Sequence, residues 1–313
     1  MHTKKTPLLV ALALAAATAA PTPVGAQARP QAPIFGTGIE IINLSLSVTD
    51  PQNNFVTDLG QRDFAVFEDG IRQELSLFTH ENLPISMVLM IDTSASMEEK
   101  LATAQAAAIK FTKTLREQDV AQIVQFNDRA TTLQPFTNDP AALEAAIKKT
   151  EASGPTALHN ALYIALKDLM KDKKAAELRR RAIVLLSDGE DTASLVSDEQ
   201  VLELAKKSEI NIYAISLRPS RASDRQRQAF SQAEYLVNAL TRETGGRAFF
   251  PSSIGELDSV YDRIAEELRT LYSIGYVSSN ARRDGKWRRI VVRVPDREGI
   301  TVRHKLGYYA PRS

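Results

Sequence analysis

The chain has 313 residues, of which 43% are hydrophobic, 25% charged and 6% aromatic. This balance is typical of a folded globular protein and argues against a disordered or fibrous one. Lysine and arginine number 39, and aspartate and glutamate 38, so the net charge of +1 lacks the basic excess of a nucleic-acid-binding domain. Because there is no cysteine, disulfides, thiolate metal sites, cysteine nucleophiles and cysteine-linked lipid anchors are excluded.

The N-terminal segment has the parts of a secretory signal peptide. Two lysines precede an apolar run, Leu8 to Ala20, and Ala26-Gln27-Ala28 supplies small residues for cleavage after position 28. The run is shorter than the roughly 20 residues of a membrane-spanning helix, although an uncleaved anchor is the alternative. We expect residues 1–28 to be a signal peptide and the protein to be exported, periplasmic or extracellular, without stable membrane insertion.

Both ends of the mature chain have the alternation of half-buried strands. Apolar residues occupy every second position over residues 42–48 and again over residues 290–294. The segment Asp63 to Phe78 reads as two strands joined at Glu68-Asp69-Gly70. These patterns predict strands near both termini.

The middle of the chain has a different pattern, in which short apolar runs alternate with amphipathic stripes. The runs are residues 85–91, 183–186 and 210–217, and the helical stripes are residues 101–115, 158–169, 230–240 and 257–271. Apolar strands that alternate with amphipathic helices indicate an α/β fold. We expect a doubly wound, mostly parallel sheet with helices on both faces.

These patterns predict an inserted domain. The α/β domain would occupy residues 85–270, between an N-terminal β segment, residues 29–84, and a C-terminal one, residues 271–313. Neither β segment is long enough to bury a core of its own. We expect the two segments to pair as one β-sandwich around the insertion, and two separate β appendages are the alternative.

Oxygen-bearing side chains follow the first apolar strand. Asp92, Ser94 and Ser96 stand at every second position, so that one loop could turn three oxygens toward one point. Ligands of open parallel sheets bind where the strands end, at their carboxyl ends. The alternative is that these residues only cap the helix that follows.

Two later loops supply further oxygen ligands. Asp188 follows the apolar run 183–186, and Thr156 stands where the helix 158–169 begins, a position at which it would otherwise be an N-cap. Together the three loops offer two carboxylates and three hydroxyls, with no histidine or thiol. Such hard ligands favour Mg²⁺, Mn²⁺ or Ca²⁺ over zinc.

On these residues the chain resembles a von Willebrand factor type A (VWA) domain from roughly Pro84 to Thr270, and specifically bacterial exported proteins of this type. The resemblance extends to the flanks, where residues 63–70 read Asp-Phe-x-Val-x-Glu-Asp-Gly and residues 307–309 read Gly-Tyr-Tyr. It implies a metal-ion-dependent adhesion site. The metal ligands that it implies are Asp92, Ser94, Ser96, Thr156 and Asp188.

Residues within and just after the first loop depart from the family pattern or leave it open. Ala95 stands where the family often has glycine, which leaves the implied ligands intact. Glu98 and Glu99 suggest the adjacent second metal site of some relatives. Lys100 follows them, however, and the sequence does not establish that site.

The resemblance implies an exported adhesion or assembly module that coordinates an Asp or Glu carboxylate of a protein partner through the divalent cation. One alternative is a scaffold in which the metal only ties the loops together. The other is a metal-dependent hydrolase with Asp188 or Glu190 as base. We expect no enzyme, since His159 lies outside the metal-binding loops and neither a nucleophile elbow nor a phosphate loop is present. The sequence specifies no oligomeric state.

Two short basic clusters raise the question of nucleic-acid binding. They are Arg179-Arg180-Arg181 and the arginines around Trp287, which could act as a stacking platform. Their brevity, the balanced charge and the expected export argue against a nucleic-acid partner. We expect solvated arginines where strands begin and a Trp287 that anchors the core of the sandwich.

Overall fold

The computed structural model describes His2 and residues 41–80, 83–171, 179–188, 191–217 and 224–312, with the backbone alone for 224–233. The predicted signal peptide, apart from His2, lies outside the described residues. Residues Glu40–Ser313 form one unit, separate from Met1–Ile39.

A six-stranded sheet forms the middle of the chain, in the order β10-β9-β8-β5-β6-β7. Its strands are β5 (Ile85–Asp92), β6 (Val120–Phe126), β7 (Ala130–Thr137), β8 (Arg180–Ser187), β9 (Ile210–Ser216) and β10 (Arg247–Phe249). Neighbouring strands are parallel except β7, which runs antiparallel to β6. The predicted, mostly parallel sheet is therefore confirmed.

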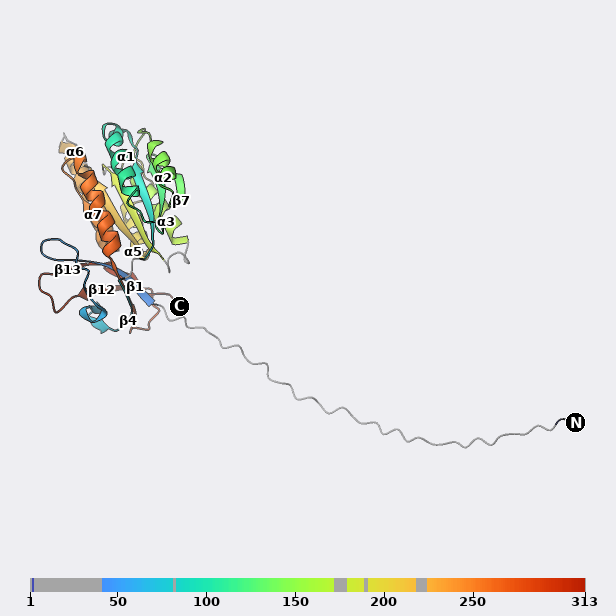
Figure 1. The fold of residues 1–313 in the computed structure, drawn as a ribbon, viewed down its shortest axis with the longest axis vertical. Coiled ribbons are helices and arrows are strands. Elements are labelled where there is room, and N and C mark those ends of the chain that lie inside the picture. The colour runs from blue at the N-terminus through green and yellow to red at the C-terminus, as the bar shows by residue number, and fades with distance from the viewer. Residues whose placement is uncertain are drawn as a thin grey trace. The chain divides into compact units, whose positions relative to one another are not determined.

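Helices cover both faces of this sheet (Figure 1). They are α1 (Glu98–Thr112), α2 (Pro140–Lys148), α3 (Leu158–Lys171), α5 (Asp198–Lys207), α6 (Asp224–Thr244) and α7 (Leu257–Thr270), with short 3₁₀ turns at Ala95–Met97 and Ile254–Glu256. On β5, Met87 and Leu89 pack with α1, α2 and α7, whereas Val88 and Met90 pack with α3, α5 and α6. The central strand is buried on both faces, which explains its unbroken apolar run.

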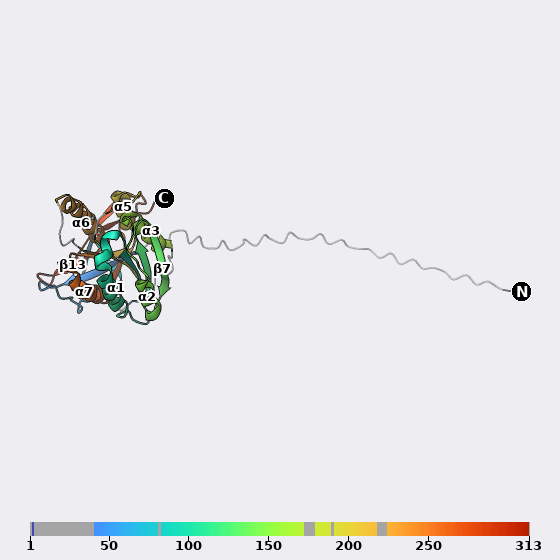
Figure 2. The same cartoon turned by 90° about the horizontal axis from the view of Figure 1, so that it is seen from above.

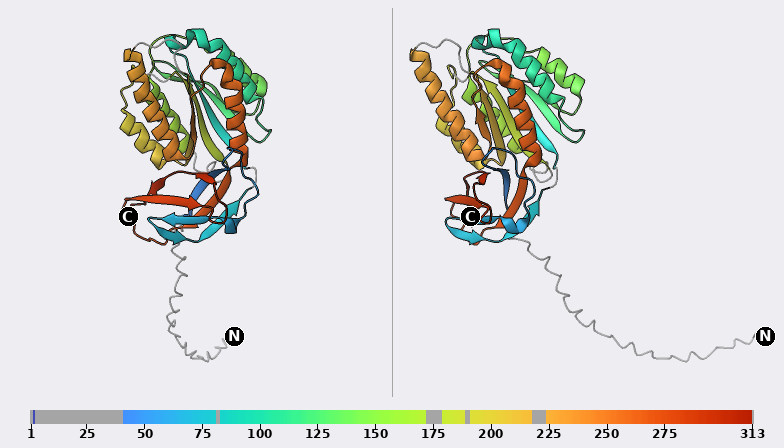
Figure 3. Two further views of the ribbon diagram at one scale, coloured as in Figure 1. Left: turned by 90° about the vertical axis from the view of Figure 1, so that its left-hand side faces the viewer. Right: turned by 60° about the vertical axis from the view of Figure 1, so that its left-hand side comes forward.

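Strands from both ends of the chain pair with one another in a β-sandwich that flanks the α/β part. One sheet has the order β13-β1-β11-β4 and the other β14-β12-β2-β3. The strands are β1 (Ile41–Thr49), β2 (Ala65–Glu68), β3 (Ile71–Gln73), β4 (Leu75–Thr79), β11 (Tyr272–Val277), β12 (Trp287–Arg293), β13 (Thr301–Arg303) and β14 (Gly307–Tyr309), with a 3₁₀ turn at Gln61–Asp63. Strands β1 and β2 pair antiparallel with β11 and β12, respectively. Figure 2 shows the helices of the α/β part from above, and Figure 3 shows the sandwich below that part.

The segment Asp63 to Phe78 forms three strands, so the expectation of two was wrong. Strands β2 and β3 make a hairpin in one sheet, and β4 lies beside β11 in the other. Asp69 and Gly70 in the hairpin turn both have positive φ, 47° and 86°, as type I′ turns require. The chain changes sheet at Glu74. Periodicity does not reveal such a step, because both sheets of a sandwich accept alternating side chains.

A buried polar cluster joins the two flanking motifs inside the sandwich. The carboxylate of Glu68 accepts hydrogen bonds from Tyr276 (2.9 Å) and Tyr308 (3.0 Å) and lies 3.3 Å from the Arg288 guanidinium. Burial, followed by the negative charge of Glu68, raises the pKa of Tyr276 well above its ordinary value. The Glu-Asp-Gly motif near one end of the chain and the Gly-Tyr-Tyr motif near the other thus meet in one cluster.

Helix α7 runs directly into β11 and is tied to the sandwich by a buried carboxylate. Glu267 of α7 is fully buried, accepts a hydrogen bond from the Tyr213 hydroxyl (3.1 Å) and pairs with Arg303 of β13. Arg303 also donates to Ser47 of β1 at 3.2 Å. These contacts connect the sheet, the last helix and the sandwich.

Two glycines end α6 where the chain turns toward β10. Gly245 has a φ of +79°, which favours glycine. A Cβ on Gly246 would lie 1.9 Å from the backbone oxygen of Ile212, so only glycine fits this close approach. Helix α6 accordingly ends at Thr244, directly before these two glycines.

Candidate metal site

Strand pairing places the first and third loops side by side. Strands β5 and β8 are parallel neighbours, with Ile91 opposite Leu186, so Asp92 and Ser187 end adjacent strands. The Ser187 hydroxyl donates a hydrogen bond to Asp92 Oδ2 at 2.6 Å. Asp188 follows directly, so the two carboxylates stand at the same edge of the sheet.

Asp92 is fully buried and held by hydrogen bonds from both loops. Besides the Ser187 bond, its Oδ1 accepts from the backbone N–H of Ser94 at 2.9 Å. The hydroxyls of Ser94 and Ser96 are 3.0 Å apart. Burial raises the pKa of Asp92 from 3.8 to about 6, against these hydrogen bonds and with a smaller contribution from the Asp188 charge. A cation beside this carboxylate would stabilise its ionised form.

The second loop is hydrogen-bonded to the first. The N–H of Ala95 donates to the carbonyl of Gly154 (3.0 Å), and the N–H of Ser153 donates to the carbonyl of Thr93 (2.8 Å). Gly154 has a φ of +72°, which favours glycine at this turn.

Thr156 connects the second loop to the third. It is buried, and its N–H donates to the Thr192 hydroxyl at 3.0 Å. Its carbonyl accepts from the N–H groups of Thr192 (2.8 Å) and Ala193 (3.0 Å). The structure therefore brings together the loops that carry all five sequence-predicted ligands.

Asp188 has one oxygen paired and one unpaired. Its Oδ2 lies 3.2 Å from the Lys100 ammonium, with the two side chains 7% and 22% exposed, respectively. Its Oδ1 is buried and has no hydrogen-bond partner among the described residues. A buried carboxylate oxygen without a donor is uncommon in folded proteins. This oxygen and the hydroxyl-rich neighbourhood fit a hard divalent cation. Glu190, the other base considered for a hydrolase, lies outside the described residues.

Other candidate groups near the site are engaged elsewhere or point to solvent. Glu98 and Glu99 are exposed in the first turn of α1. His159 Nδ1 lies 3.2 Å from the Val196 carbonyl and 3.5 Å from Asp191, so this ring holds the third loop against α3. Over the described part of the chain, no three His, Cys, Asp or Glu residues cluster as metal ligands. A site here would therefore depend on two carboxylates and on hydroxyls.

Sequence reasoning missed two features of this site, namely Ser187 and the pairing of Lys100 with Asp188. Ser187 reads as the last residue of a strand, and only the register with β5 shows that it contacts Asp92. A signal for Lys100 exists in principle, because a lysine in the first turn of a helix opposes the helix dipole.

The basic cluster at the opposite end of β8 has a structural role. Arg180 and Arg181 are buried, so the expectation that they are solvated was wrong. Arg180 donates to the carbonyls of Leu268 and Leu271 at the end of α7, and Arg181 donates to Leu169 near the end of α3. Helix C-termini attract cations in this way.

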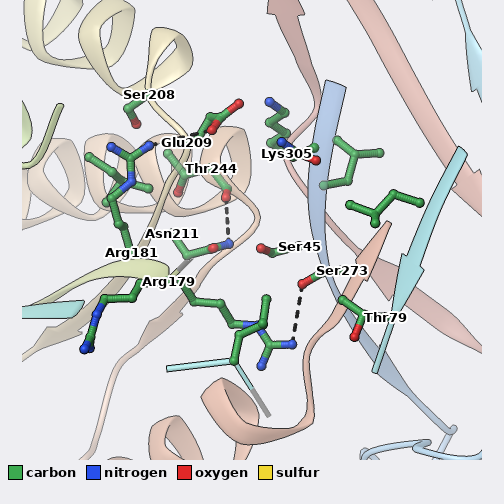
Figure 4. A pocket seen from close by; sticks show the side chains of 16 residues that line it. Ser45, Thr79, Arg179, Arg181, Ser208, Glu209, Asn211, Thr244, Ser273 and Lys305 are labelled. Atoms are coloured by element: carbon green, nitrogen blue, oxygen red, sulfur yellow. Dashed lines mark hydrogen bonds and ion pairs between the residues drawn. The ribbon is translucent and has the colours of Figure 1, made fainter. Parts of the chain in front are cut away.

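A cavity of about 280 Å³ lies beside this cluster, between β8, β9 and the outer face of β1, β4 and β11 (Figure 4). Lys305 and Glu209 line it together with the arginines.

Trp287, expected in the sandwich core, is instead half-buried. It packs edge-on against Tyr309 at 5.0 Å between ring centroids, beneath the Lys206 ammonium.

No helix in the described ranges combines the length and the apolar character needed to cross a bilayer.

Comparisons with known proteins agree with this architecture. Residues 87–190 match the family model of the von Willebrand factor type A domain. The chain is 32% identical over 112 residues to an uncharacterized protein of Synechocystis sp., an alignment that covers 35% of this chain and only 26% of that protein. It is 28% identical over 232 residues to a UPF0353 protein of Nocardia farcinica, covering 64% of this chain and 67% of that protein.

Among solved structures, proximal thread matrix protein 1 from the mussel byssus, whose MIDAS motif is occupied by zinc, superposes with a TM-score of 0.51. The identity is 16%, and the match covers 64% of this chain and 49% of that one. A von Willebrand factor type A structure from Catenulispora acidiphila is 13% identical with a TM-score of 0.49, over 88% of this chain and 74% of that one. At these identities the likeness concerns the fold alone. The match to the family model agrees with the resemblance seen in the sequence: residues 87–190 fit a von Willebrand factor type A domain.

Proposed function

We propose that this protein is an exported, non-enzymatic module that binds a protein partner through a divalent cation. The partner would present an Asp or Glu carboxylate, and the cation would be Mg²⁺, with Mn²⁺ or Ca²⁺ as substitutes. The residues that would hold it are Asp92, Ser94, Ser96, Thr156 and Asp188.

One observation carries the proposal, namely the placement of two buried carboxylates at adjacent strand ends with too few donors. Asp92 is fully buried with a raised pKa, and Asp188 Oδ1 has no hydrogen-bond donor among the described residues. Two buried carboxylates side by side are costly unless a positive charge is nearby. A dication would balance both charges.

The protein groups around the site would orient the ligands. Ser187 and the N–H of Ser94 fix the Asp92 carboxylate, and the hydrogen bonds among the three loops fix the positions of Ser94 and Thr156. A bound cation would supply a Lewis-acidic position that a carboxylate from the partner can complete. Since an exposed ion pair contributes only about 0–1 kcal/mol, direct ligation is the stronger source of metal-dependent recognition.

Isothermal titration with MgCl₂, MnCl₂, CaCl₂ and ZnCl₂ tests the cation. We expect one site per chain that prefers Mg²⁺ or Mn²⁺ and is lost in Asp188→Asn. Asp258→Asn, which removes an exposed surface carboxylate, is the matched control and should bind as the wild type does. A preference for zinc, the metal that occupies the MIDAS motif of the mussel protein, would contradict the hard-ligand argument for this chain.

Affinity capture from the native envelope fraction tests the partner. A protein retained in Mg²⁺, released by chelator and absent with Asp188→Asn would support metal-mediated recognition. Retention that survives chelator while the fold persists would instead favour a purely structural metal. Capture of the same protein by Asp258→Asn would show that the loss of binding in Asp188→Asn does not follow from the removal of any one carboxylate.

Export is tested by the N-terminus of the mature protein. The proposal expects the envelope or secreted form to begin at Arg29, after removal of residues 1–28. A protein that keeps its first residues and stays in the cytoplasm would contradict it.

A further inference from the structure

The ion pair between Lys100 and Asp188 is unusual for its position. Lys100 is the third residue of α1, in the turn where the helix dipole disfavours a cation. Its ammonium nevertheless reaches a carboxylate that lies 88 positions further along the chain. The pair is therefore not a local pair on the helix surface, but a contact between the start of α1 and the third loop of the site.

Within the described part of the chain, Lys100 is also the single basic side chain within 4 Å of either site carboxylate. With a side chain that is 22% exposed, Lys100 is not locked in the interior. Its four-carbon stem is flexible, and its head group can move to water when another cation arrives.

We propose that the Lys100 ammonium competes with the divalent cation for Asp188 and so lowers the cation affinity of the site. This inference rests on the proposed function. Lys100 and a dication both draw their binding energy from the same carboxylate, and at short range they repel each other. A dication bound at Oδ1 of Asp188 therefore weakens the contact of the ammonium with Oδ2 and favours release of the lysine.

The consequence is a site that is never left with two uncompensated buried carboxylates. Without the dication, Lys100 supplies one positive charge to the pair formed by Asp92 and Asp188. With the dication, the lysine is released to solvent. The cation concentration at which the partner binds is then set by Lys100 as well as by the ligands.

Lys100→Met tests the competition, because methionine keeps the length of the side chain and removes its charge. We expect the affinity for MgCl₂ alone, measured by isothermal titration, to rise on the order of tenfold, or 1.4 kcal/mol. Lys110→Met is the matched control. It removes the same charge from the same helix but breaks only the exposed pair with Asp258, so its affinity for Mg²⁺ should stay within about twofold of wild type.

Thermal unfolding provides a readout that does not depend on a partner. In chelator, Lys100→Met should melt below wild type, because Asp188 loses its counter-charge. In saturating Mg²⁺ that difference should vanish, since the cation takes over the same role. Lys100→Gln serves as a second variant should the methionine variant not fold.

The outcomes separate this inference from the proposed function. Equal or weaker Mg²⁺ binding by both Lys100 variants, with wild type binding normally, overturns the competition and leaves the metal site standing. Weaker binding would mean that Lys100 orients Asp188 for the cation. Absence of Mg²⁺ binding by wild type and variants alike overturns the metal site itself, and the competition with it.

Discussion

Replacing Asp92 by asparagine should remove metal binding and yet stabilise the protein in chelator at neutral pH. Burial is the main cause of the raised pKa of Asp92, about 6 against an ordinary value of 3.8. A raised pKa means that the charged carboxylate is less favourable in the folded protein than in the unfolded chain. Asparagine has nearly the same shape and carries no charge.

The magnitude follows from the shift. About two pKa units correspond to roughly 3 kcal/mol of unfolding free energy. This contribution is fully present below about pH 4 and is lost as the pH rises through about 6, so the loss is nearly complete at pH 7.5. Asparagine avoids that loss but gives up one acceptor of the hydrogen bonds from Ser187 and Ser94, at about 1 kcal/mol. The net gain expected at pH 7.5 is therefore about 2 kcal/mol.

Urea denaturation in EDTA, at pH 7.5 and at pH 4.5, measures the difference between wild type and Asp92→Asn. We expect the variant to be more stable at pH 7.5 and equal to or below wild type at pH 4.5. Adding Mg²⁺ should stabilise only the wild type, in proportion to its affinity. A variant that is less stable in EDTA at pH 7.5, or a difference independent of pH, would refute the argument that burial destabilises the ionised carboxylate.

Two further predictions concern the scaffold. Glu68→Gln should lower the unfolding free energy by about 3–5 kcal/mol in urea titrations, because it leaves Arg288 buried without its counter-charge. A loss below about 1 kcal/mol would show that the stability of the protein does not depend on this cluster. Gly246→Ala places a Cβ against the Ile212 carbonyl, so it should abolish soluble expression or reduce the melting temperature by at least 10 °C. In the control Gly255→Ala, the new Cβ would be 3.7 Å from its nearest neighbour, and this variant should melt within a few degrees of wild type.

Much of the fold could be predicted because burial determines the periodic pattern of apolar residues along each strand and helix. The unbroken apolar run of β5 reflects burial on both faces, and the alternation in β1 reflects the core of the sandwich. The separate strand β4 could not be predicted, because the change of sheet at Glu74 depends on pairing with β11, far away in the sequence. The burial of Arg180 was hidden for a similar reason, since its partners are backbone carbonyls of a helix end.

For the candidate site, the residue types and their positions at strand ends could be read from the sequence, whereas the contacts between their side chains could not. The positions of Asp92 and Asp188 after apolar runs suffice to place them at one edge of a parallel sheet. Whether each oxygen is paired depends on atoms that periodicity does not describe. Ser187 donates to Asp92 because of the β5–β8 register, and Lys100 reaches Asp188 because of where α1 starts.

The way the sandwich is assembled has a consequence for how the chain folds as it is made. Strand β1 pairs with β11, and β2 pairs with β12, so the second strand of each pair is synthesised only after the whole α/β segment. The α/β segment is contiguous and can form its native contacts earlier. The edges of β1 and β2 that pair with β11 and β12 stay unpaired until those strands have been synthesised. Truncation before β11 should therefore leave a folded middle with an aggregation-prone N-terminal extension, which limited proteolysis of nascent-chain-length fragments can reveal.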